Sequence, residues 1–272
     1  MAGVSGPLKW FGGKSYLSAR INALMPPHLH YVEPFFGGGT VLLGHDGANR
    51  SELVNDLHGD LINFWRVLRD PGLFQSFLRA CQTTPLARDD WEDAGQILAE
   101  HLASGPVERA WAFFVFCRQS RAGQMTGFTS PTRTRLRRGM NGNVSEWLSA
   151  IDGLPAVHCR LQRVMIEDGD ALVLIAREDT PDTLFYLDPP YLHETRTGSD
   201  EYLHEMTREQ HVALLNILQG LRGKFLLSGY HSELYDQAAI LHRWTCHEFT
   251  LPNNAAGGEA KRRMVECVWC NF

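Results

Sequence analysis

The stretch Thr183-Leu-Phe-Tyr-Leu-Asp188-Pro-Pro-Tyr191 decides the fold class. Its five mostly apolar, β-compatible residues before Asp188 predict a buried strand. Proline cannot donate a hydrogen bond to a strand ladder, so we expect the strand to end at Asp188. A carboxylate, a rigid turn and an aromatic ring then follow at the carboxyl end of a strand. In open α/β sheets, that is the edge where ligands bind.

The turn also carries a specific chemical possibility. Asp188 and the carbonyl of Pro189 can accept both hydrogens of an amino group on an aromatic base, which aims the nitrogen lone pair at an electrophile. The ring of Tyr191 offers a face on which a flipped base can stack. The alternative is a strand-ending turn with a capping aspartate, although such a turn does not require the aromatic residue. The candidate catalytic residues are Asp188, Pro189, Pro190 and Tyr191.

Composition is that of an ordinary globular chain, with 272 residues, 44% hydrophobic and 21% charged. This length allows one domain with an insertion or two domains. No apolar run approaches the roughly 20 residues that span a bilayer, and the first residues lack the apolar core of a signal peptide. We therefore expect a cytoplasmic protein with no membrane contact and with reduced cysteines. The CxxC pair of Cys267 and Cys270 has no second pair and falls in an expected strand, so no metal site is predicted.

Charge is distributed unevenly along the chain. The net charge of −5 and the pI near 6.2 argue against a purely electrostatic DNA binder. From Arg109 to Ser145, however, the chain has seven arginines and neither Asp nor Glu. Because a nucleic-acid footprint can be local, this segment is a candidate DNA-binding surface.

Two glycine-rich segments lie near the N-terminus. Trp10-Phe-Gly-Gly-Lys14 precedes an expected helix that ends at Leu24, and could offer backbone amides and a cation to a small anion. A plain glycine-rich cap is the alternative. Glu33-Pro-Phe35-Phe-Gly37-Gly-Gly39-Thr40 predicts a strand, a glycine turn and a helix start, where the backbone can approach a ligand closely. Its spacing is not GxGxxG, which disfavours a dinucleotide.

Two acidic residues follow further expected strands. Asp56 comes after the strand Ser51–Asn55, about twenty residues past the glycines, where nucleoside-binding sheets place a ribose-binding carboxylate. Asp170 comes after an expected strand over Cys159–Ile166 and suits the amino group of an adenine. In both cases the alternative is a helix cap.

Residues 61–155 predict an inserted helical subdomain, with helices over 61–68, 73–80, 91–102 and 107–117. Arginine, glutamine and asparagine side chains bind base edges, and arginine also binds phosphates. A solvated basic loop is the alternative. The candidate DNA-binding residues are Arg118, Arg121, Gln124, Arg133, Arg135, Arg137, Arg138 and Asn141.

The C-terminal part predicts the end of the sheet. Thr207 and Gln210 fit a capping box that starts a helix ending at Leu221. A strand over Lys224–Tyr230 follows. Two β-rich stretches, Arg243–Thr250 and Met264–Asn271, predict a terminal antiparallel hairpin on a mostly parallel sheet.

Five segments together resemble the Dam-type family of DNA adenine-N6 methyltransferases. In chain order they are Pro7-Leu-Lys-Trp10-Phe-Gly-Gly-Lys14, Glu33-Pro-Phe-Phe-Gly-Gly-Gly-Thr40, Asn55-Asp56, Asp188-Pro-Pro-Tyr191 and Glu266-Cys-Val-Trp-Cys-Asn271. The resemblance implies a Rossmann-like methyltransferase sheet and S-adenosylmethionine as the methyl donor. The donor-binding residues that it implies are Trp10, Lys14, Glu33, Phe35, Gly37, Gly39, Asp56, Asp170 and Asp188.

The same resemblance implies that different parts of the chain have different functions. Residues 1–60 and 156–272 would form the catalytic domain, and residues 61–155 the target-recognition insert. The expected activity is methylation of an adenine flipped out of double-stranded DNA, by a monomer or weak dimer. The alternatives are cytosine-N4, RNA-base or protein-glutamine methylation, or an inactive DNA-binding protein. The sequence predicts neither the DNA site nor a restriction endonuclease partner.

Overall fold

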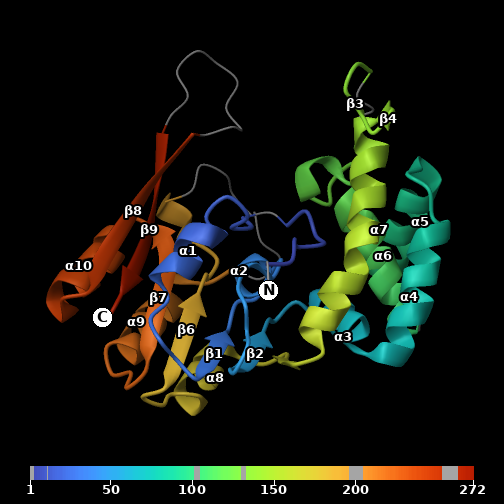
Figure 1. The fold of residues 1–272 in the computed structure, drawn as a ribbon. Coiled ribbons are helices and arrows are strands. Elements are labelled where there is room, and N and C mark those ends of the chain that lie inside the picture. Colours follow the sequence, from blue (N-terminus) through green and yellow to red (C-terminus); the bar gives the residue numbers. More distant parts are fainter. Residues whose placement is uncertain (1–2, 11, 101–104, 130–132, 196–204, 253–262) are drawn as a thin grey trace. The chain divides into compact units, whose positions relative to one another are not determined.

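The computed structural model describes all residues except 1–2, 11, 101–104, 130–132, 196–204 and 253–262 (Figure 1). The chain divides into two compact units. The first contains Met1–Asn22, Gly37–Gly47 and Gly59–Ile166, and the second contains Ala23–Phe36, Ala48–His58 and Glu167–Phe272. The predicted insert, residues 61–155, lies within the first unit, and its functional boundaries stay a prediction.

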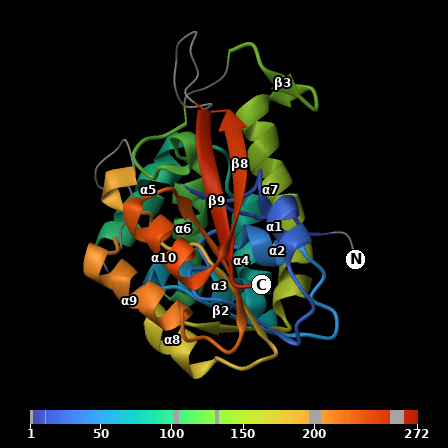
Figure 2. The ribbon, with the colours of Figure 1, turned by 90° about the vertical axis from the view of Figure 1, so that its left-hand side faces the viewer.

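The described residues form a seven-stranded sheet with the strand order β5-β2-β1-β6-β7-β9-β8. Strand β1 pairs in parallel with β2 and β6, and β6 pairs in parallel with β7, whereas β9 is antiparallel to both β7 and β8. The mostly parallel sheet with a terminal hairpin is therefore confirmed, and Figure 2 shows the hairpin strands side by side. The bounds are β1 His30–Glu33, β2 Ser51–Asn55, β5 Val164–Glu167, β6 Thr183–Leu187, β7 Lys224–Tyr230, β8 Thr245–Pro252 and β9 Arg263–Cys270.

The middle of the sheet is apolar because its strands are covered on both faces. All five residues of β6 are buried, which matches the continuous apolar run in the sequence. Three helices, α8 (Ala171–Arg177), α9 (Arg208–Leu218) and α10 (Glu233–His242), contribute to one core with β1, β2, β6, β7 and β9. The predicted capping box of Thr207 and Gln210 is present at the start of α9.

The first unit is mainly helical, as predicted. Phe64 is fully buried and lies within 6 Å, ring centre to ring centre, of Trp65, Phe77, Phe113 and Phe114. These aromatic rings come from three helices and form the centre of the helical core. The helices are α1 Ser18–Leu24, which ends in the second unit, α2 Thr40–Gly44, α3 Gly59–Arg69, α4 Pro71–Thr83, α5 Arg88–Ala99, α6 Pro106–Gln119 and α7 Gly142–Leu161. Two 3₁₀ turns, Arg121–Gly123 and His193–Thr195, and a short hairpin of β3 (Leu136–Arg137) and β4 (Met140–Asn141) complete the elements.

The strand expected over Cys159–Ile166 is wrong in its first half. Helix α7 continues through Pro155 to Leu161, and β5 begins only at Val164. The reason is that Leu154, Val157 and Leu161 recur at helical spacing and are fully buried. Their tertiary contacts outweigh the helix-breaking tendency of the proline.

Within the described residues, no helix is both long and apolar enough to cross a bilayer.

Candidate active site and nucleic-acid interface

Polar residues follow three neighbouring parallel strands of the second unit. Glu33 ends β1, Asp56 follows β2, and Asp188 follows β6. Because β2, β1 and β6 are adjacent and parallel, their carboxyl ends meet at one edge of the sheet (Figure 1). Asp188 and Asp56 are half-buried, whereas Glu33 is buried. The sequence predicted a strand before each of these carboxylates, and the pairing of β1, β2 and β6 brings the three strand ends together; the roles of the residues stay a prediction.

Tyr191 is held by the C-terminal hairpin. Its hydroxyl donates a hydrogen bond to Oε1 of Glu266 in β9, at 2.7 Å, and its ring meets the edge of Tyr230 with 4.8 Å between ring centres. Burial, together with the negative charges of Asp188 and Glu266, raises the pKa of Tyr191 well above its ordinary value. The phenol therefore stays protonated and remains a hydrogen-bond donor at any physiological pH.

A small cavity lies beside this tyrosine. Its volume is about 10 Å³, which is roughly room for one water molecule. Tyr191 itself is only 7% exposed. A base therefore cannot stack on Tyr191 in this conformation unless neighbouring side chains move. The cavity is lined by Tyr191, Leu192, Thr195, Gly229, Tyr230 and Tyr235.

Glu33 is a buried carboxylate with a local hydrogen-bond donor. The hydroxyl of Tyr31 donates to its Oε2 at 2.8 Å, and only 2% of Glu33 is exposed. Burial and the charge of Glu33 raise the pKa of Tyr31 well above its ordinary value, so the phenol keeps its proton. Phe35, two residues further on, is partly buried and packs against the core of the second unit.

Asn55 joins two of the loops at this edge, a role that the sequence did not predict. Its Nδ2 donates to the carbonyls of Pro34 and Gly169, each at 3.0 Å, and its Oδ1 accepts from the Gly169 amide at 2.7 Å. The side chain is 1% exposed, so these bonds compensate for burying an amide. Asn55 thereby fixes the loop after β1 to the loop before α8.

Asp56 and Asp170 each accept hydrogen bonds from backbone amides a few residues further along the chain. Oδ1 of Asp56 accepts from the amide of His58 at 3.0 Å, next to the start of α3. Oδ1 of Asp170 accepts from the amides of Leu172 and Val173, at 2.7 and 3.2 Å, and the residue is exposed. The helix-cap interpretation of Asp170 is therefore confirmed, while a role in donor binding stays a prediction.

In the first unit, Trp10 lies against the glycine loop. Gly37 and Gly39 have φ angles of 49° and 65°, which are left-handed conformations that favour glycine. A Cβ atom on Gly37 would lie 2.9 Å from Nε1 of Trp10. A Cβ atom on Gly38 would lie 2.7 Å from the Cβ of Trp10. Trp65 donates from Nε1 to the Gly37 carbonyl at 3.1 Å. The glycines are thus required both for backbone conformation and for the close approach of Trp10.

Lys14 belongs to the same unit and is 5% exposed. Its Nζ donates to the carbonyl of Gly12 at 3.1 Å, and its own carbonyl accepts from Leu17 and Ser18 at the start of α1. A buried ammonium needs such oxygen partners because its desolvation is costly.

The last part of the arginine-rich segment forms the β3–β4 hairpin. Arg137 pairs with Met140, and the two-residue turn between them, Arg138-Gly139, has positive φ at both positions, which is the type I′ arrangement. Leu136 is 71% exposed. The hairpin thus presents arginines and one apolar side chain to solvent.

Acidic groups lie closer to these arginines than the sequence window suggested. Glu146, one residue beyond the acid-free segment, accepts from Nη2 of Arg135 at 2.6 Å and lies 3.5 Å from Nη1 of Arg137. Arg138 lies 3.4 Å from Asp152. The interpretation that the segment lacks balancing acids is therefore wrong, because it counted neighbours along the chain rather than around α7. These arginines are exposed, and such ion pairs contribute little to stability, so phosphates could displace the acids.

The remaining predicted DNA-binding residues divide into two groups. Arg121, Gln124 and Arg133 are exposed. Arg118 is half-buried, donates from Nη2 to the carbonyl of Glu146 at 3.0 Å, and has its pKa lowered by burial. Asn141 caps α7 by accepting from the amide of Asn143 at 2.9 Å. The contacts of Arg118 and Asn141 are therefore structural.

A family model described as D12 class N6 adenine-specific DNA methyltransferase matches residues 10–100 and 111–249. The chain belongs to this family. The membership confirms the resemblance found in the sequence motifs, and the match includes the glycine loop and Asp188–Tyr191.

Individual relatives of this D12 class chain match over shorter segments. A type II methyltransferase, M1.LlaDCHI, of Lactococcus lactis subsp. cremoris is 40% identical over 63 residues. The DNA N-6-adenine-methyltransferase of Escherichia phage P1 is 38% identical over 61 residues, and the DNA adenine methylase of Vibrio cholerae serotype O1 is 42% identical over 62 residues. These segments are 23%, 22% and 23% of this chain, and they span 22%, 8% and 22% of the respective relatives.

Some structural residues of this member of the D12 class family had no predicted role. Asn55 and Glu266 fall in segments that carried the family resemblance, yet only the structure shows Asn55 joining two loops and Glu266 holding Tyr191. The sequence pattern around Trp65 predicts only an apolar residue in the core of a helix. Nothing in its pattern indicates a hydrogen bond to the glycine loop, because that bond depends on tertiary packing.

Proposed function

We propose that this chain transfers the methyl group of S-adenosylmethionine to the N6 atom of an adenine flipped out of double-stranded DNA. The observation that carries the proposal is the position of Asp188. Its carboxylate follows the central parallel strand β6, at the same sheet edge as Glu33 and Asp56. The family's activity is the second support.

The residues present suit such a donor. Asp56 follows β2, where a ribose-binding carboxylate is expected, and Glu33 offers a buried carboxyl group to the ammonium of the donor's amino-acid end. In the first unit, the left-handed glycine loop lets its backbone approach Trp10 more closely than a Cβ atom would allow. The other residues proposed to bind the donor are Phe35 and Asp170 in the second unit and Lys14 in the first.

The chemistry required of the protein is positioning. When bound, S-adenosylmethionine supplies an electrophilic methyl group on a sulfonium. The carboxylate of Asp188 accepts one N6 hydrogen and the carbonyl of Pro189 accepts the other, so that lone-pair density on N6 points at the methyl carbon. Transfer would leave the C–S electron pair on the sulfur of the donor and an extra proton on N6, and the carboxylate of Asp188 would accept that proton. Pro190 restricts the turn, so this geometry costs little reorganisation during the reaction.

DNA binding is proposed for the exposed arginines of the β3–β4 hairpin and for Arg121, Gln124 and Arg133. Base flipping costs a few kcal/mol, which phosphate contacts and stacking on Tyr191 would offset. Because Tyr191 is covered in the structure described here, stacking requires that its surroundings open when the base enters.

The test is transfer of a tritiated methyl group to duplex DNA. Asp188→Ala should lower turnover by about 10²-fold or more, since removal of one oriented polar group from an active site typically has that effect. Asp93→Ala, at an exposed acid on α5 outside the proposed binding sets, is the matched control and should keep turnover within about twofold. Thermal unfolding checks that both variants fold. Full turnover by folded Asp188→Ala would refute the mechanism.

Chromatography of the methylated DNA after digestion to nucleosides identifies the base. N6-methyladenine is the expected product. If the product is N4-methylcytosine, the proposed mechanism holds but the substrate is cytosine and not adenine. Absence of methyl transfer from a protein that still binds DNA would favour an inactive DNA-binding protein.

A further inference from the structure

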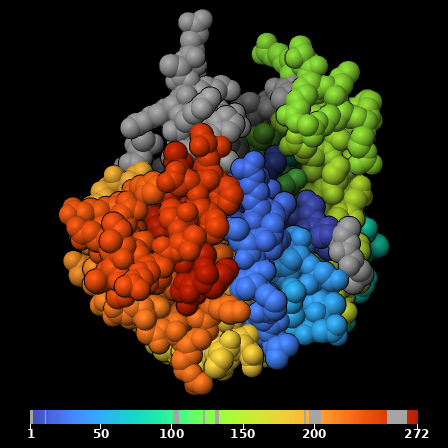
Figure 3. All heavy atoms as spheres, turned by 60° about the vertical axis from the view of Figure 1, so that its left-hand side comes forward, coloured from blue at the N-terminus to red at the C-terminus, as the bar shows by residue number. Residues whose placement is uncertain are grey.

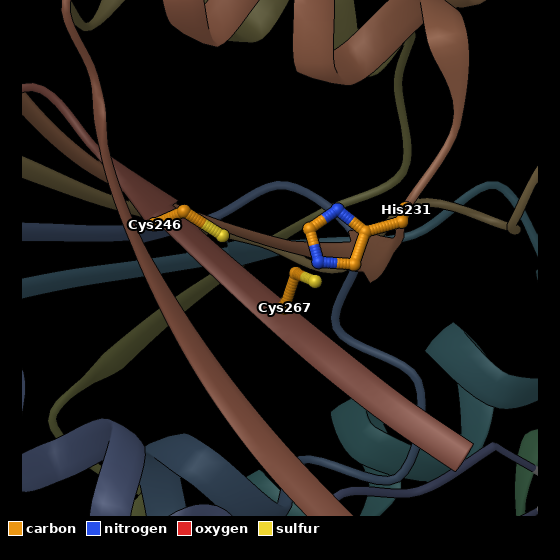
Figure 4. Close-up of side chains that lie close together, drawn as sticks. All are labelled: His231, Cys246 and Cys267. Atoms are coloured by element: carbon orange, nitrogen blue, oxygen red, sulfur yellow. The ribbon is translucent and has the colours of Figure 1, made fainter.

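Three potential metal ligands converge in the second unit, and none of them belongs to the residues proposed for methyl transfer. His231 follows β7, Cys246 lies on β8 and Cys267 lies on β9. One ligand atom from each lies within 4.8 Å of the other two. Figure 4 shows the imidazole ring facing the two thiols.

The strand register explains why these cysteines meet. Cys246 lies opposite Trp269, and Cys267 lies opposite Glu248. Residues two apart in a strand share a face, so Cys246, Glu248 and Cys267 project from the same face of the hairpin. Cys270 is three residues from Cys267 and therefore projects from the opposite face. The CxxC motif in the sequence is thus not the relevant pair, because the true partner of Cys267 comes from the neighbouring strand.

We propose that His231, Cys246 and Cys267 form a binding site for a thiophilic divalent metal ion, of which Zn²⁺ is the natural candidate. Zinc sites in proteins are tetrahedral and use cysteine thiolates and histidine nitrogens. With metal–sulfur and metal–nitrogen distances near 2.3 and 2.0–2.1 Å, ligand atoms in such a site are about 3.6–3.8 Å apart. The observed limit of 4.8 Å is within about 1 Å of this spacing, so small side-chain rotations would close the site.

The surrounding carboxylates complete the arrangement. Nδ1 of His231 lies 2.8 Å from Oδ1 of Asp236, and its Nε2 lies 3.3 Å from Oε1 of Glu248. If Nε2 binds the metal, Nδ1–H still donates to Asp236, which orients the ring and increases the basicity of the ligand nitrogen. Glu248 then lies where a fourth ligand is needed. Both carboxylates also favour a cation electrostatically.

The site is accessible and lies next to the proposed active site. His231 and Cys246 are exposed and Cys267 is buried, so an ion can enter from solvent. The face formed by the C-terminal elements is coloured orange to red in Figure 3. His231 and Cys267 are the sequence neighbours of Tyr230 and Glu266, both of which contact Tyr191. Metal binding would therefore fix the strand ends that hold the Asp188–Tyr191 turn.

The first experiment titrates the reduced, metal-free, full-length chain with Co²⁺. The expected result is one ion per chain, with the intense visible bands of tetrahedral cobalt and a thiolate-to-metal charge-transfer band. His231→Ala and Cys246→Ser should each weaken binding at least about tenfold. Asp236→Ala should weaken it about 10–100-fold, because it removes the acceptor that orients the histidine.

Two variants provide matched controls. His247→Ala removes a histidine from the opposite face of the same strand, and Cys159→Ser removes an exposed thiol from α7. Both should bind Co²⁺ as the unmodified chain does. Because the substituted ligands His231 and Cys246 are exposed, those variants should fold, and their metal-free melting temperatures should match that of the unmodified chain.

The second experiment measures thermal unfolding with and without Zn²⁺. An ion that binds only the folded chain should raise the melting temperature of the unmodified chain and of both controls, but not of His231→Ala or Cys246→Ser. Failure of the reduced chain to bind Co²⁺ tetrahedrally would overturn the proposal. Equal loss of binding in His247→Ala would do the same. These readouts do not depend on methyl transfer, so they are independent of the proposed activity.

Discussion

The hydroxyl of Tyr191 donates a hydrogen bond to the carboxylate of Glu266, with 2.7 Å between the two oxygens. The two residues are 75 positions apart, and both are buried. The C-terminal hairpin therefore holds the aromatic residue of the Asp188–Tyr191 turn. A change in the hairpin can reach the proposed active site without touching Asp188.

This bond predicts a difference between two substitutions. Tyr191→Phe removes the donor and leaves a buried carboxylate oxygen without it, so we expect a loss of about 1–3 kcal/mol in the free energy of unfolding. Glu266→Gln keeps an oxygen that can accept from the phenol, so its loss should be smaller. Denaturant titration of both variants measures the difference. A larger loss for Glu266→Gln than for Tyr191→Phe would show that other contacts of Glu266 dominate.

The glycine loop predicts a sharp dependence on side-chain size. Gly37→Ala should destabilise the chain by about 1–2 kcal/mol from its left-handed φ alone, and the contact between the new Cβ and Trp10 would add to that. Donor binding should weaken at the same time if the loop binds S-adenosylmethionine. Thermal unfolding and a donor titration give the two quantities.

Gly153→Ala is the matched control for this substitution. Gly153 lies inside α7, and a Cβ atom there would have no atom within 4 Å, so alanine should stabilise the helix by about 0.5–1 kcal/mol. If Gly37→Ala is as stable as the unmodified chain, the backbone of the loop does not require glycine.

Much of this fold could be predicted from local sequence patterns. The apolar run before Asp188, the capping box of Thr207 and Gln210, and the β-rich C-terminal stretches each depend on residues close in sequence. The shared sheet edge of Glu33, Asp56 and Asp188 followed because parallel strands align their carboxyl ends.

The errors and omissions arose where distant residues meet. Cys159 reads as β-compatible, but burial of Leu154, Val157 and Leu161 on one helix face extends α7. The arginines of the hairpin have no acid near them in sequence, yet Glu146 reaches them from the first turns of α7. Cys246 and Cys267 are in no shared motif, and only strand register brings them together.

Glu146 predicts a pH dependence. Burial alone would raise the pKa of Glu146, but Lys9, Arg135 and Arg137 together lower it below the ordinary value of 4.5. A lowered folded-state pKa means that the ion pairs stabilise the chain above the unfolded-state pKa, and that this contribution disappears as pH falls through the folded-state pKa. Compared with Glu146→Gln, the unmodified chain should therefore be more stable at neutral pH and lose that advantage below about pH 4.5. Chemical denaturation of both proteins across this range measures the difference. An advantage that does not decline as pH falls below about 4.5 would contradict the assignment.

The exposed arginines of the β3–β4 hairpin predict the salt dependence of DNA binding. If Arg137 contacts a phosphate, Arg137→Ala should weaken binding to all DNA sequences alike. It should also reduce the slope of log K against log salt concentration by about 0.9. Glu146→Gln should act in the opposite direction, because it removes the acid that competes with phosphate for Arg135 and Arg137.

Arg177→Ala is the matched control, since Arg177 is exposed and paired with Glu167 and Glu178 in the second unit. Fluorescence anisotropy with duplex DNA at several salt concentrations gives both slope and affinity. If Arg177→Ala changes the slope as much as Arg137→Ala does, binding depends on total charge and the hairpin has no special role.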